Sequence, residues 1–261
     1  MKKNKLFYLT GGIILLLILV RLCSHHETHP KFTPRDYPEI IRSGILRAVM
    51  EYNSISYHAD KDSISGFDYE LLNAFAKAKK LRLEVTPEMS FEERLKGISE
   101  GKYDLIATGT IVTTRSKDTL LFTQPLLLSK QILVQRKREE GKDSLYIQNQ
   151  LELGGKMLHI VKGSPALLRL HNLINEIADT IYIKEIDQYG PEQLMAMVSE
   201  GDIDYAVCDP NLDIDTDISF TQFYAWGVAK HAPLLLDSLN VWLNQYMKSE
   251  DYRVLYKKYF Y

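Results

Sequence analysis

The stretch SEGKYDLI at residues 99–106 returns in altered form as SEGDIDYA at residues 199–206. Apolar residues recur at helical spacing before each copy, and a glycine, Gly101 or Gly201, then supplies the backbone conformation that commonly follows the end of a helix. The residues after each glycine read as a buried strand of a parallel sheet. We therefore predict two similar α/β lobes.

The side chains that follow these two predicted strands indicate a ligand site. Thr108, Thr110 and Arg115 follow the first strand, and Asp209 follows the second. Ligands of open α/β sheets bind beyond the carboxyl ends of the strands, so a guanidinium from one lobe and a carboxylate from the other would face one cleft. A free amino acid carries the complementary pair of charges, because it has both a carboxylate and an ammonium group.

The composition bounds the class of protein and its partners. The chain has 261 residues, of which 45% are hydrophobic, and this is enough to bury one large core or two modest cores. Its net charge is -2, and its lysines and arginines are scattered among acidic residues. Because a phosphate backbone is bound by a continuous basic surface, we expect no nucleic acid partner.

The N-terminus, residues 1–23, has the layout of a secretory segment. Lys2, Lys3 and Lys5 precede an uncharged run over residues 6–20, as in the basic and apolar regions of an export signal. A helix of that length spans about 22 Å, which is short against a hydrocarbon core of about 30 Å. A cleaved signal, an uncleaved membrane anchor and a lipidated Cys23 all stay open. In each case we expect the body of the chain outside the cytoplasm, at the periplasmic face of the bacterial inner membrane.

The next segment, residues 24–36, is polar, contains two prolines and reads as a linker. We interpret its His25, His26 and His29 as solvated, because no other ligand cluster accompanies them, and we expect no metal and no cofactor. Cys208 falls on a predicted buried strand. With Cys23 as the only other cysteine in the sequence, a disulfide framework is excluded.

Hydrophobic periodicity and turn residues divide the rest of the chain into alternating strands and helices. Strands are predicted at residues 45–50, 81–85, 103–107, 130–135, 157–161, 182–185, 205–208 and 223–229. Helices are predicted at residues 67–78, 91–99, 165–178, 191–200, 233–247 and 251–259. We expect a first lobe over residues 37–134, a second over 135–224, and a return to the first over 225–261. Two crossings between the lobes would form a hinge.

Six short motifs, in their order and spacing, resemble those of the family 3 solute-binding proteins, the extracytoplasmic amino-acid receptors of ABC importers, over residues 37–261. The motifs lie at residues 66–71, 101–106, 108–115, 161–164, 204–209 and 256–260. The resemblance implies an α/β fold of the two-lobe periplasmic-binding-protein-like (type II) class, with a hinge and an interlobe cleft, preceded here by an N-terminal hydrophobic helix. It also implies a small amino acid or related zwitterion as the ligand and an ABC permease as a partner.

The family's ligand site maps onto matching positions of this chain. In the family pattern an arginine grips the ligand α-carboxylate, and hydroxyl residues precede it at the spacing of Thr108, Thr110 and Arg115. A guanidinium is a planar fork that meets a carboxylate through two charge-assisted hydrogen bonds. The family's acid for the ligand α-amino group falls on Asp209.

Two further sets of candidates come from the same resemblance. Gly163 and Ser164 stand where the family offers backbone and hydroxyl donors at a helix N-terminus, which favours an anion. Pro165 departs from the family pattern and removes one donor. The family also places an acid and an aromatic residue over the ligand after the first strand, and the candidates here are Glu51, Tyr52, Asn53 and Tyr57.

Three alternatives to transport stay open. Residues 53–57, 161–164 and 225–226 resemble the N-terminal module of membrane-bound lytic murein transglycosylases of type F, which implies a regulatory or sensory role beside a cell-wall enzyme. Those enzymes carry a further lysozyme-like domain, which we expect to be absent because the sequence ends at Tyr261. A dehydratase of prephenate or arogenate would need a general acid, for which Glu51 is the candidate. The third is a degenerate pair of lobes that binds only protein. We expect a binding protein and no enzyme.

Overall fold

The computed structural model describes residues 32–61, 63–137, 146–208 and 222–260. The chain divides into one unit that ends at Thr33 and a compact unit over Pro34–Tyr261, and only the second is described below. In the described ranges, no helix has the length and apolar character of a membrane span. The predicted hydrophobic helix at residues 6–20, Cys23 and the linker histidines lie outside those ranges.

The first sheet has the strand order β4-β1-β5-β12-β6, and β7 also pairs with β12. Its central strand β5 is parallel to β1 on one side and antiparallel to β12 on the other. The strands are β1 (Ile45–Met50), β4 (Arg82–Pro87), β5 (Leu105–Ile111), β6 (Leu120–Phe122), β7 (Leu127–Ser129) and β12 (Gln222–Ala229). A separate hairpin joins β2 (His58–Asp60) to β3 (Ser63–Ser65).

The second sheet has the strand order β10-β9-β11-β8. Its strands are β8 (Ile132–Gln135), β9 (Met157–Val161), β10 (Tyr182–Ile186) and β11 (Tyr205–Cys208). β8 is antiparallel to β11, whereas β9 is parallel to both neighbours. The chain has therefore reached the second sheet by Ile132, because this strand pairs with Cys208 and its neighbours. The charged run after Gln135, where we expected the crossing, instead follows a strand of the second sheet.

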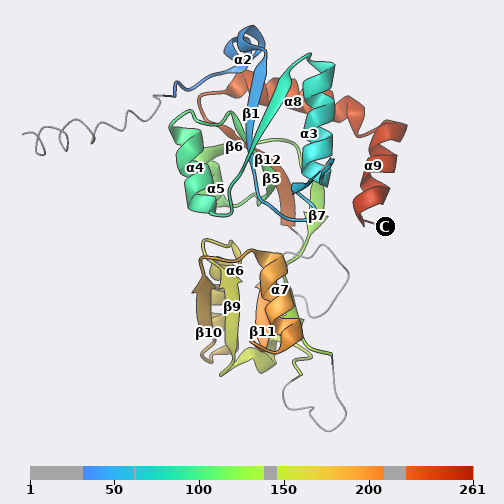
Figure 1. Cartoon of the computed structure of the whole chain (residues 1–261). Coiled ribbons are helices and arrows are strands. Elements are labelled where there is room, and N and C mark those ends of the chain that lie inside the picture. Colours follow the sequence, from blue (N-terminus) through green and yellow to red (C-terminus); the bar gives the residue numbers. More distant parts are fainter. Residues whose placement is uncertain (1–31, 62, 138–145, 209–221, 261) are drawn as a thin grey trace, which may run out of the picture. The chain divides into compact units, whose positions relative to one another are not determined.

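Helices cover both faces of the second sheet and surround the first (Figure 1). Those of the first lobe are α2 (Tyr37–Ser43), α3 (Phe67–Ala78), α4 (Phe91–Ser99), α5 (Thr114–Thr119), α8 (Pro233–Tyr246) and α9 (Glu250–Phe260). Those of the second lobe are the 3-10 turn η2 (Gln150–Leu153), α6 (Ala166–Ile177) and α7 (Pro191–Glu200). The six helices predicted between residues 67 and 259 are all present, but α2, α5, η2, β6, β7 and the β2–β3 hairpin were not predicted.

Each sheet has its own hydrophobic core. Trp226, Phe67 and Phe75 are the largest fully buried side chains of the first core. The second sheet is packed by one cluster under α6, around Leu158 and Leu170. Leu194 and Val198 of α7 form another cluster with Ala206 and Cys208 on the opposite face. Because each sheet buries its own apolar residues, the predicted two-lobe α/β fold is confirmed.

The repeated stretch folds the same way in both lobes. Gly101 and Gly201 have φ angles of 73° and 88°, in the left-handed region that glycine adopts at little cost. After each glycine the chain turns back onto the preceding helix, where Lys102 N donates to Gly97 O at 2.8 Å and Asp202 N donates to Met197 O at 2.9 Å. The turns lead into β5 and β11, as predicted.

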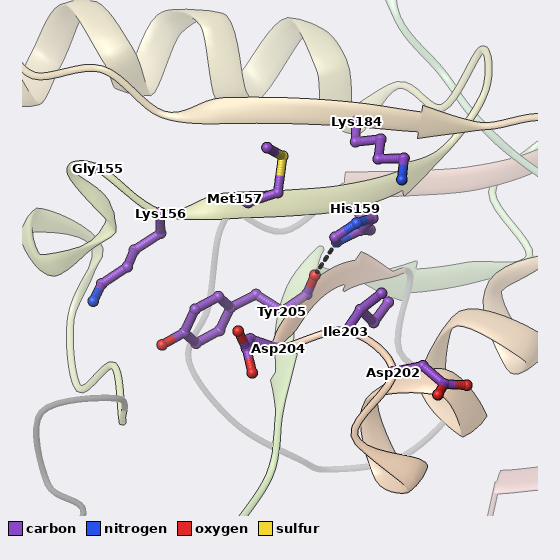
Figure 2. A pocket seen from close by; sticks show the side chains of 9 residues that line it. All are labelled: Gly155, Lys156, Met157, His159, Lys184, Asp202, Ile203, Asp204 and Tyr205. Atoms are coloured by element: carbon purple, nitrogen blue, oxygen red, sulfur yellow. Dashed lines mark hydrogen bonds between the residues drawn. The ribbon is translucent and has the colours of Figure 1, made fainter.

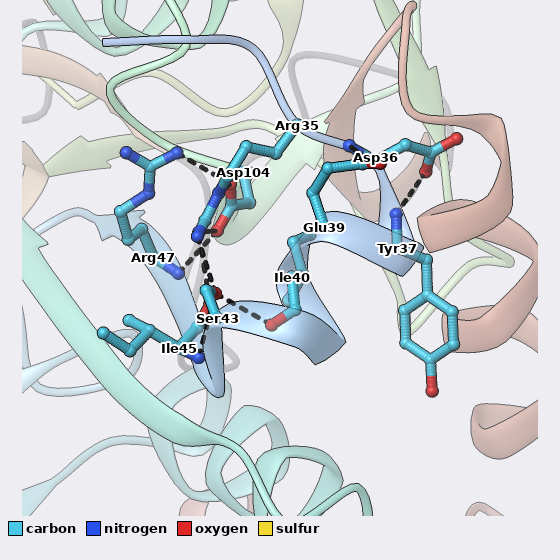
Figure 3. Close-up of polar contacts among 9 residues, drawn as sticks. All are labelled: Arg35, Asp36, Tyr37, Glu39, Ile40, Ser43, Ile45, Arg47 and Asp104. Atoms are coloured by element: carbon cyan, nitrogen blue, oxygen red, sulfur yellow. Dashed lines mark hydrogen bonds and ion pairs between the residues drawn. The ribbon is translucent and has the colours of Figure 1, made fainter.

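Asp104, the aspartate of the first repeat, binds two arginines (Figure 3). The side chain of Asp104 has no exposed surface, and its Oδ2 lies 2.6 Å from Arg35 Nη2. Its Oδ1 lies 3.2 Å from Arg47 Nη2, and the backbone N of Arg47 donates to Oδ2 at 2.7 Å. Arg35 also donates to Ser43 Oγ and Ile45 O. Asp104 therefore joins the segment before α2 to the start of β1.

Candidate functional site

The carboxyl end of β5 carries a buried cluster of hydroxyl and carboxyl groups. Thr108 Oγ1 lies 2.6 Å from Ser56 Oγ, and Ser56 Oγ lies 2.6 Å from Asp68 Oδ2. Trp226 Nε1 donates to Asp68 Oδ1 at 2.7 Å. All four residues are less than a tenth exposed. Of these four, only Thr108 was predicted as a site residue.

Local structure explains why these four residues meet. Ser56 lies in the loop after β1, and Asp68 is the second residue of α3, which begins after Gly66. The pairing of β12 with β5 shifts register between Ala225 and Gly227, and such a shift changes the direction of a side chain. Trp226 lies within that irregularity, so its indole reaches the carboxylate of Asp68.

Burial raises the pKa of Asp68 to about 6 from an ordinary value of 3.8. The hydrogen bonds from Ser56, Trp226 and the backbone of Gly109 oppose that rise, and the charge of Glu51 adds a smaller increase. A carboxyl group with this pKa changes its protonation just below neutral pH. Such groups are enriched at functional sites, although structural clusters produce them too.

Thr110 lies two residues further along β5 and is also buried. Its hydroxyl donates to the carbonyl oxygen of Thr108 at 3.2 Å. The single hydroxyl proton is therefore used within the strand, and lone pairs of the oxygen are left for another group. Thr110 was predicted as a ligand residue, and in this structure its hydroxyl oxygen is oriented to accept a hydrogen bond from such a ligand.

Arg115 occupies the second position of α5, a short helix whose N-cap is Thr113. The hydroxyl of Thr113 accepts from the backbone N of Ser116 at 3.0 Å, so the residues after β5 form a capped helical turn that was not predicted. The side chain of Arg115 and the whole of Asp209 lie outside what the structure describes. Their convergence on one ligand stays a prediction.

Glu51 follows β1 and is held by two neighbours. Its Oε2 lies 3.2 Å from Nη2 of the buried Arg94 on α4, and its Oε1 accepts from Asn53 Nδ2 at 3.3 Å. Arg94 also donates to the carbonyl oxygen of Glu88 at 2.6 Å, and burial lowers the pKa of this guanidinium. Both oxygens of Glu51, the candidate general acid, are therefore already bound by neighbouring side chains of the first lobe.

The other candidates after β1, namely Tyr52, Asn53 and Tyr57, contact other residues of the same segment. Asn53 Oδ1 accepts from the backbone N of Ser56 at 2.6 Å and so shapes the loop. The hydroxyl of Tyr52 donates to the carbonyl oxygen of Ala59, and its ring makes an edge contact with that of Tyr57. In the same loop, the backbone N of Ser54 donates to Glu192 of α7 at 3.0 Å.

Gly163 and Ser164 lie at the start of α6, as predicted. The backbone N of Gly163 donates to Glu185 Oε2 at 3.1 Å, and Ser164 Oγ accepts from the backbone N of Ala166 at 3.2 Å. α6 begins at Ala166, one residue later than predicted, with Pro165 as its cap residue. A carboxylate already occupies the Gly163 donor, which agrees with the preference of a helix N-terminus for anions.

A cavity of about 370 Å³ lies elsewhere, on the second lobe (Figure 2). His159 Nδ1 donates to the carbonyl oxygen of Tyr205 at its wall, at 3.2 Å. The lining residues are Gly155, Lys156, Met157, His159, Lys184, Asp202, Ile203, Asp204 and Tyr205. None of them is a predicted ligand residue. No group of His, Cys, Asp or Glu residues in the described ranges is arranged to hold a metal ion.

Two α/β lobes with separate cores, and a polar cluster at the carboxyl end of a central strand, define a protein of the two-lobe solute-binding class. The chain belongs to the bacterial extracellular solute-binding proteins, family 3, which it matches over residues 46–261. The predicted family resemblance is thereby confirmed. Membership supports a protein that binds a small ligand.

The curated relatives are longer proteins. A membrane-bound lytic murein transglycosylase F of Photobacterium profundum is 24% identical over 237 residues, which cover 86% of this chain and 45% of the relative. The enzyme of the same name from Saccharophagus degradans is 28% identical over 205 residues, or 74% of this chain and 40% of the relative. The chain spans about half the length of the curated relatives it matches.

Solved amino-acid-binding proteins share the fold. An ancestral amino acid-binding protein described as a precursor of cyclohexadienyl dehydratase has a TM-score of 0.73 at 21% identity, over 86% of this chain and 98% of that chain. A substrate-binding protein of an ABC uptake transporter from Streptococcus pneumoniae, with bound histidine, has a TM-score of 0.73 at 19% identity, over 85% and 95%. An ancestral arginine-binding protein bound to arginine has a TM-score of 0.71 at 22% identity, over 84% and 99%.

Proposed function

We propose that this chain is an exported, membrane-associated receptor for a small amino acid or a related zwitterion. Arg115 binds the ligand carboxylate through paired charge-assisted hydrogen bonds, and Asp209 binds the ammonium group. Thr108 and Thr110 contribute hydroxyl oxygens beside the ligand. The observation that carries the proposal is the end of β5, where two buried threonines lead directly into the turn of α5 that contains Arg115. Solved proteins of the same fold are described as bound to arginine, glutamine and histidine.

Calorimetry of the purified chain against the twenty amino acids tests this proposal. We expect heat with at least one of them and a loss of affinity of about 100-fold in Arg115→Ala, because a charge-assisted pair contributes about 1.5–3 kcal/mol. Arg82→Ala is the matched control, since Arg82 is exposed on β4 and pairs only with Glu84 among the described residues. Absence of heat with every amino acid would contradict the proposal.

A role in cell-wall turnover is the second candidate. It is supported by the similarity to about half the length of several membrane-bound lytic murein transglycosylases F. As a sensor or regulator, the chain would bind small muropeptides and act on a cell-wall enzyme in place of an ABC permease. Calorimetry with small muropeptides separates the two roles: tighter binding of muropeptides than of any free amino acid favours regulation, and the reverse order favours transport.

We place the chain at the extracytoplasmic face of the inner membrane, held by residues 6–20 or by a lipid on Cys23. The charge pattern of residues 1–23 supports this location. Cell fractionation with Cys23→Ala distinguishes the anchors, because a lipid-anchored chain would lose its membrane association and a chain held by the hydrophobic segment would not. Recovery of the unaltered chain in the cytoplasm would contradict both.

A dehydratase is the less favoured function, because both oxygens of Glu51, the candidate general acid, are already bound by Arg94 and Asn53. Incubation of the purified chain with prephenate tests it directly. We expect no phenylpyruvate above the uncatalysed background.

A further inference from the structure

The hydrogen bonds around Asp68 assign a distinct role to each of its oxygens. Indole Nε1 is a donor only, so Oδ1 of Asp68 must accept from Trp226 at 2.7 Å. A proton bound to Asp68 therefore belongs on Oδ2, which faces Ser56 Oγ at 2.6 Å. Ser56 Oγ in turn faces Thr108 Oγ1 at 2.6 Å. Asp68, Ser56 and Thr108 form a continuous chain of three oxygen atoms, which we call the hydroxyl chain.

The hydroxyl chain has two possible directions, because each hydroxyl carries one proton. When Asp68 is ionised, Ser56 must donate to it, and Thr108 must then donate to Ser56. The outer side of the Thr108 oxygen then offers only lone pairs. When Asp68 is protonated, it donates to Ser56, Ser56 donates to Thr108, and the Thr108 proton points outward.

We propose that the protonation state of Asp68, transmitted through Ser56, decides whether the Thr108 hydroxyl accepts or donates at the ligand site, so that ionised Asp68 selects an ammonium group there. This inference rests on the proposed function, since it assumes that Thr108 lies beside the ligand. It makes Asp68 and Ser56 positioning residues, because they act on the ligand through Thr108. The orientation of Thr110 as an acceptor at the same strand end points to the same ligand group.

The surroundings of Asp68 permit this change of state. Burial brings its pKa to about 6, close to neutral pH. Glu51 is the charged group that acts on it through space, and its carboxylate is paired with Arg94. On the same helix, Glu70 is bound by Lys258 and by the hydroxyl of Tyr259. The neighbours from β5 and β12 are Thr108, Gly109 and Trp226, and none of these is charged.

The direction of the hydroxyl chain is testable without any ligand, by carbon-13 NMR titration of the Asp68 carboxyl carbon in the full chain. The resonance is assigned by its loss in Asp68→Asn. We expect Thr108→Val to raise the midpoint by about half a pH unit, since it removes the donor that supports the ionised form through Ser56. Thr108→Ser should restore the original midpoint.

Thr110→Val is the matched control, because it makes the same change two residues away on the same strand. The Thr110 hydroxyl donates to a backbone carbonyl and lies outside the hydroxyl chain, so its loss should leave the midpoint unchanged. Equal midpoints in the unaltered chain and in a folded Thr108→Val variant would overturn the inference. If Thr108→Val does not fold, Ser56→Ala takes its place, and its midpoint should also rise.

The consequence for ligand binding is measured with L-arginine, L-glutamine and L-histidine by calorimetry between pH 5 and pH 8. In Asp68→Asn the amide oxygen accepts from Trp226 and the amide nitrogen donates to Ser56, which fixes Thr108 as an outward donor. We expect this variant to bind about 10-fold more weakly at pH 8 and to lose most of the change in affinity between pH 5 and pH 7. Unchanged affinity and pH dependence would overturn the ligand part of the inference. If the unaltered chain binds none of the three, the receptor proposal is weakened, and the NMR titration still decides the hydroxyl chain.

Discussion

Asp104 and Asp204 occupy the same place in the two repeats, yet their surroundings differ. Asp104 has a fully buried side chain and binds both Arg35 and Arg47 (Figure 3). Asp204 is 60% exposed and pairs with Arg136 alone among the described residues. Both follow a left-handed glycine and precede a buried strand. A repeated sequence thus fixes the local turn, while the segments packed against it decide the role of the side chain.

The largest expected effect tests this difference directly. Asp104→Ala leaves two arginines near the start of β1 without their carboxylate, and we expect the free energy of unfolding to fall by about 3–5 kcal/mol. Asp204→Ala removes an exposed pair and should cost less than about 1 kcal/mol. Urea denaturation of the two variants measures both values. Equal losses of unfolding free energy in the two variants would show that burial of Asp104 does not make its ion pairs more important than that of Asp204.

The second comparison is between Asp104 and Asp68, two buried carboxyl groups of the same lobe. No cationic side chain of the described residues is bound to Asp68, and its pKa is raised to about 6 in the folded protein. Between pH 4 and pH 6 the folded state therefore holds a proton that the unfolded state has lost, so stability falls as pH rises. We expect the titration of Asp68 to lower the free energy of unfolding by about 3 kcal/mol between pH 4 and pH 6. Above pH 6 its contribution should no longer change.

Urea denaturation at several pH values, with Asp68→Asn beside the unaltered chain, isolates this contribution from those of the other carboxyl groups. The variant should become more stable relative to the unaltered chain as pH rises from 4 to 7. A constant difference between the two proteins would contradict the raised pKa.

The third prediction concerns Gly97, which lies two residues before the first repeat, at the position that Met197 occupies before the second. A Cβ atom on Gly97 would lie 2.3 Å from the ring of Tyr103, so Gly97→Ala should cost about 1–3 kcal/mol. In the second repeat, Ile203 stands in the place of Tyr103 and has a smaller side chain. Gly97→Ala combined with Tyr103→Ile should recover most of the loss in thermal denaturation. If the double variant melts no higher than Gly97→Ala alone, the contact with the Tyr103 ring is not the cause of the lost stability.

The smallest effect should be the same in both lobes. Gly101→Ala and Gly201→Ala each force a side chain into the left-handed region, at a cost of about 1–2 kcal/mol. The two melting temperatures should fall by similar amounts, because the turns share their geometry. A large difference between the variants would mean that the lobes unfold independently or that the turns differ in the unfolded state.

The fold could be predicted where each element depends on its own residues. β1, β9, β11 and α4 have the predicted bounds, since their apolar spacing and terminal turn residues lie within the element. The helix α5 has the sequence TRSKDT and no apolar period, so hydrophobic spacing could not predict it, although Thr113 caps its first turn. β8 was assigned to the wrong sheet, because pairing with β11 is not visible in either strand alone.

The candidate site could be predicted only in part. Thr108 and Thr110 were predicted to follow a strand that ends at residue 107. β5 instead continues to Ile111 and contains both threonines, and both are buried as a binding site within the lobe requires. Ser56 and Asp68 were missed, although Asp68 lies in a motif at residues 66–71 that we had recognised. The motif indicated family membership, but a spacing within one helix does not reveal that its carboxylate meets a hydroxyl from the loop after β1.

By itself, the sequence determined that this protein has two α/β units, each ending a helix at glycine and entering a buried strand, because those choices depend on residues a few positions apart. Only the tertiary structure decided that Asp104 pairs with two arginines and that Asp68 is buried without a cationic partner among the described residues. Arg35 lies 69 residues from Asp104, and Trp226 lies 158 residues from Asp68. Charge pairing and burial depend on residues that are distant in the sequence, and these residues become neighbours only when the chain folds.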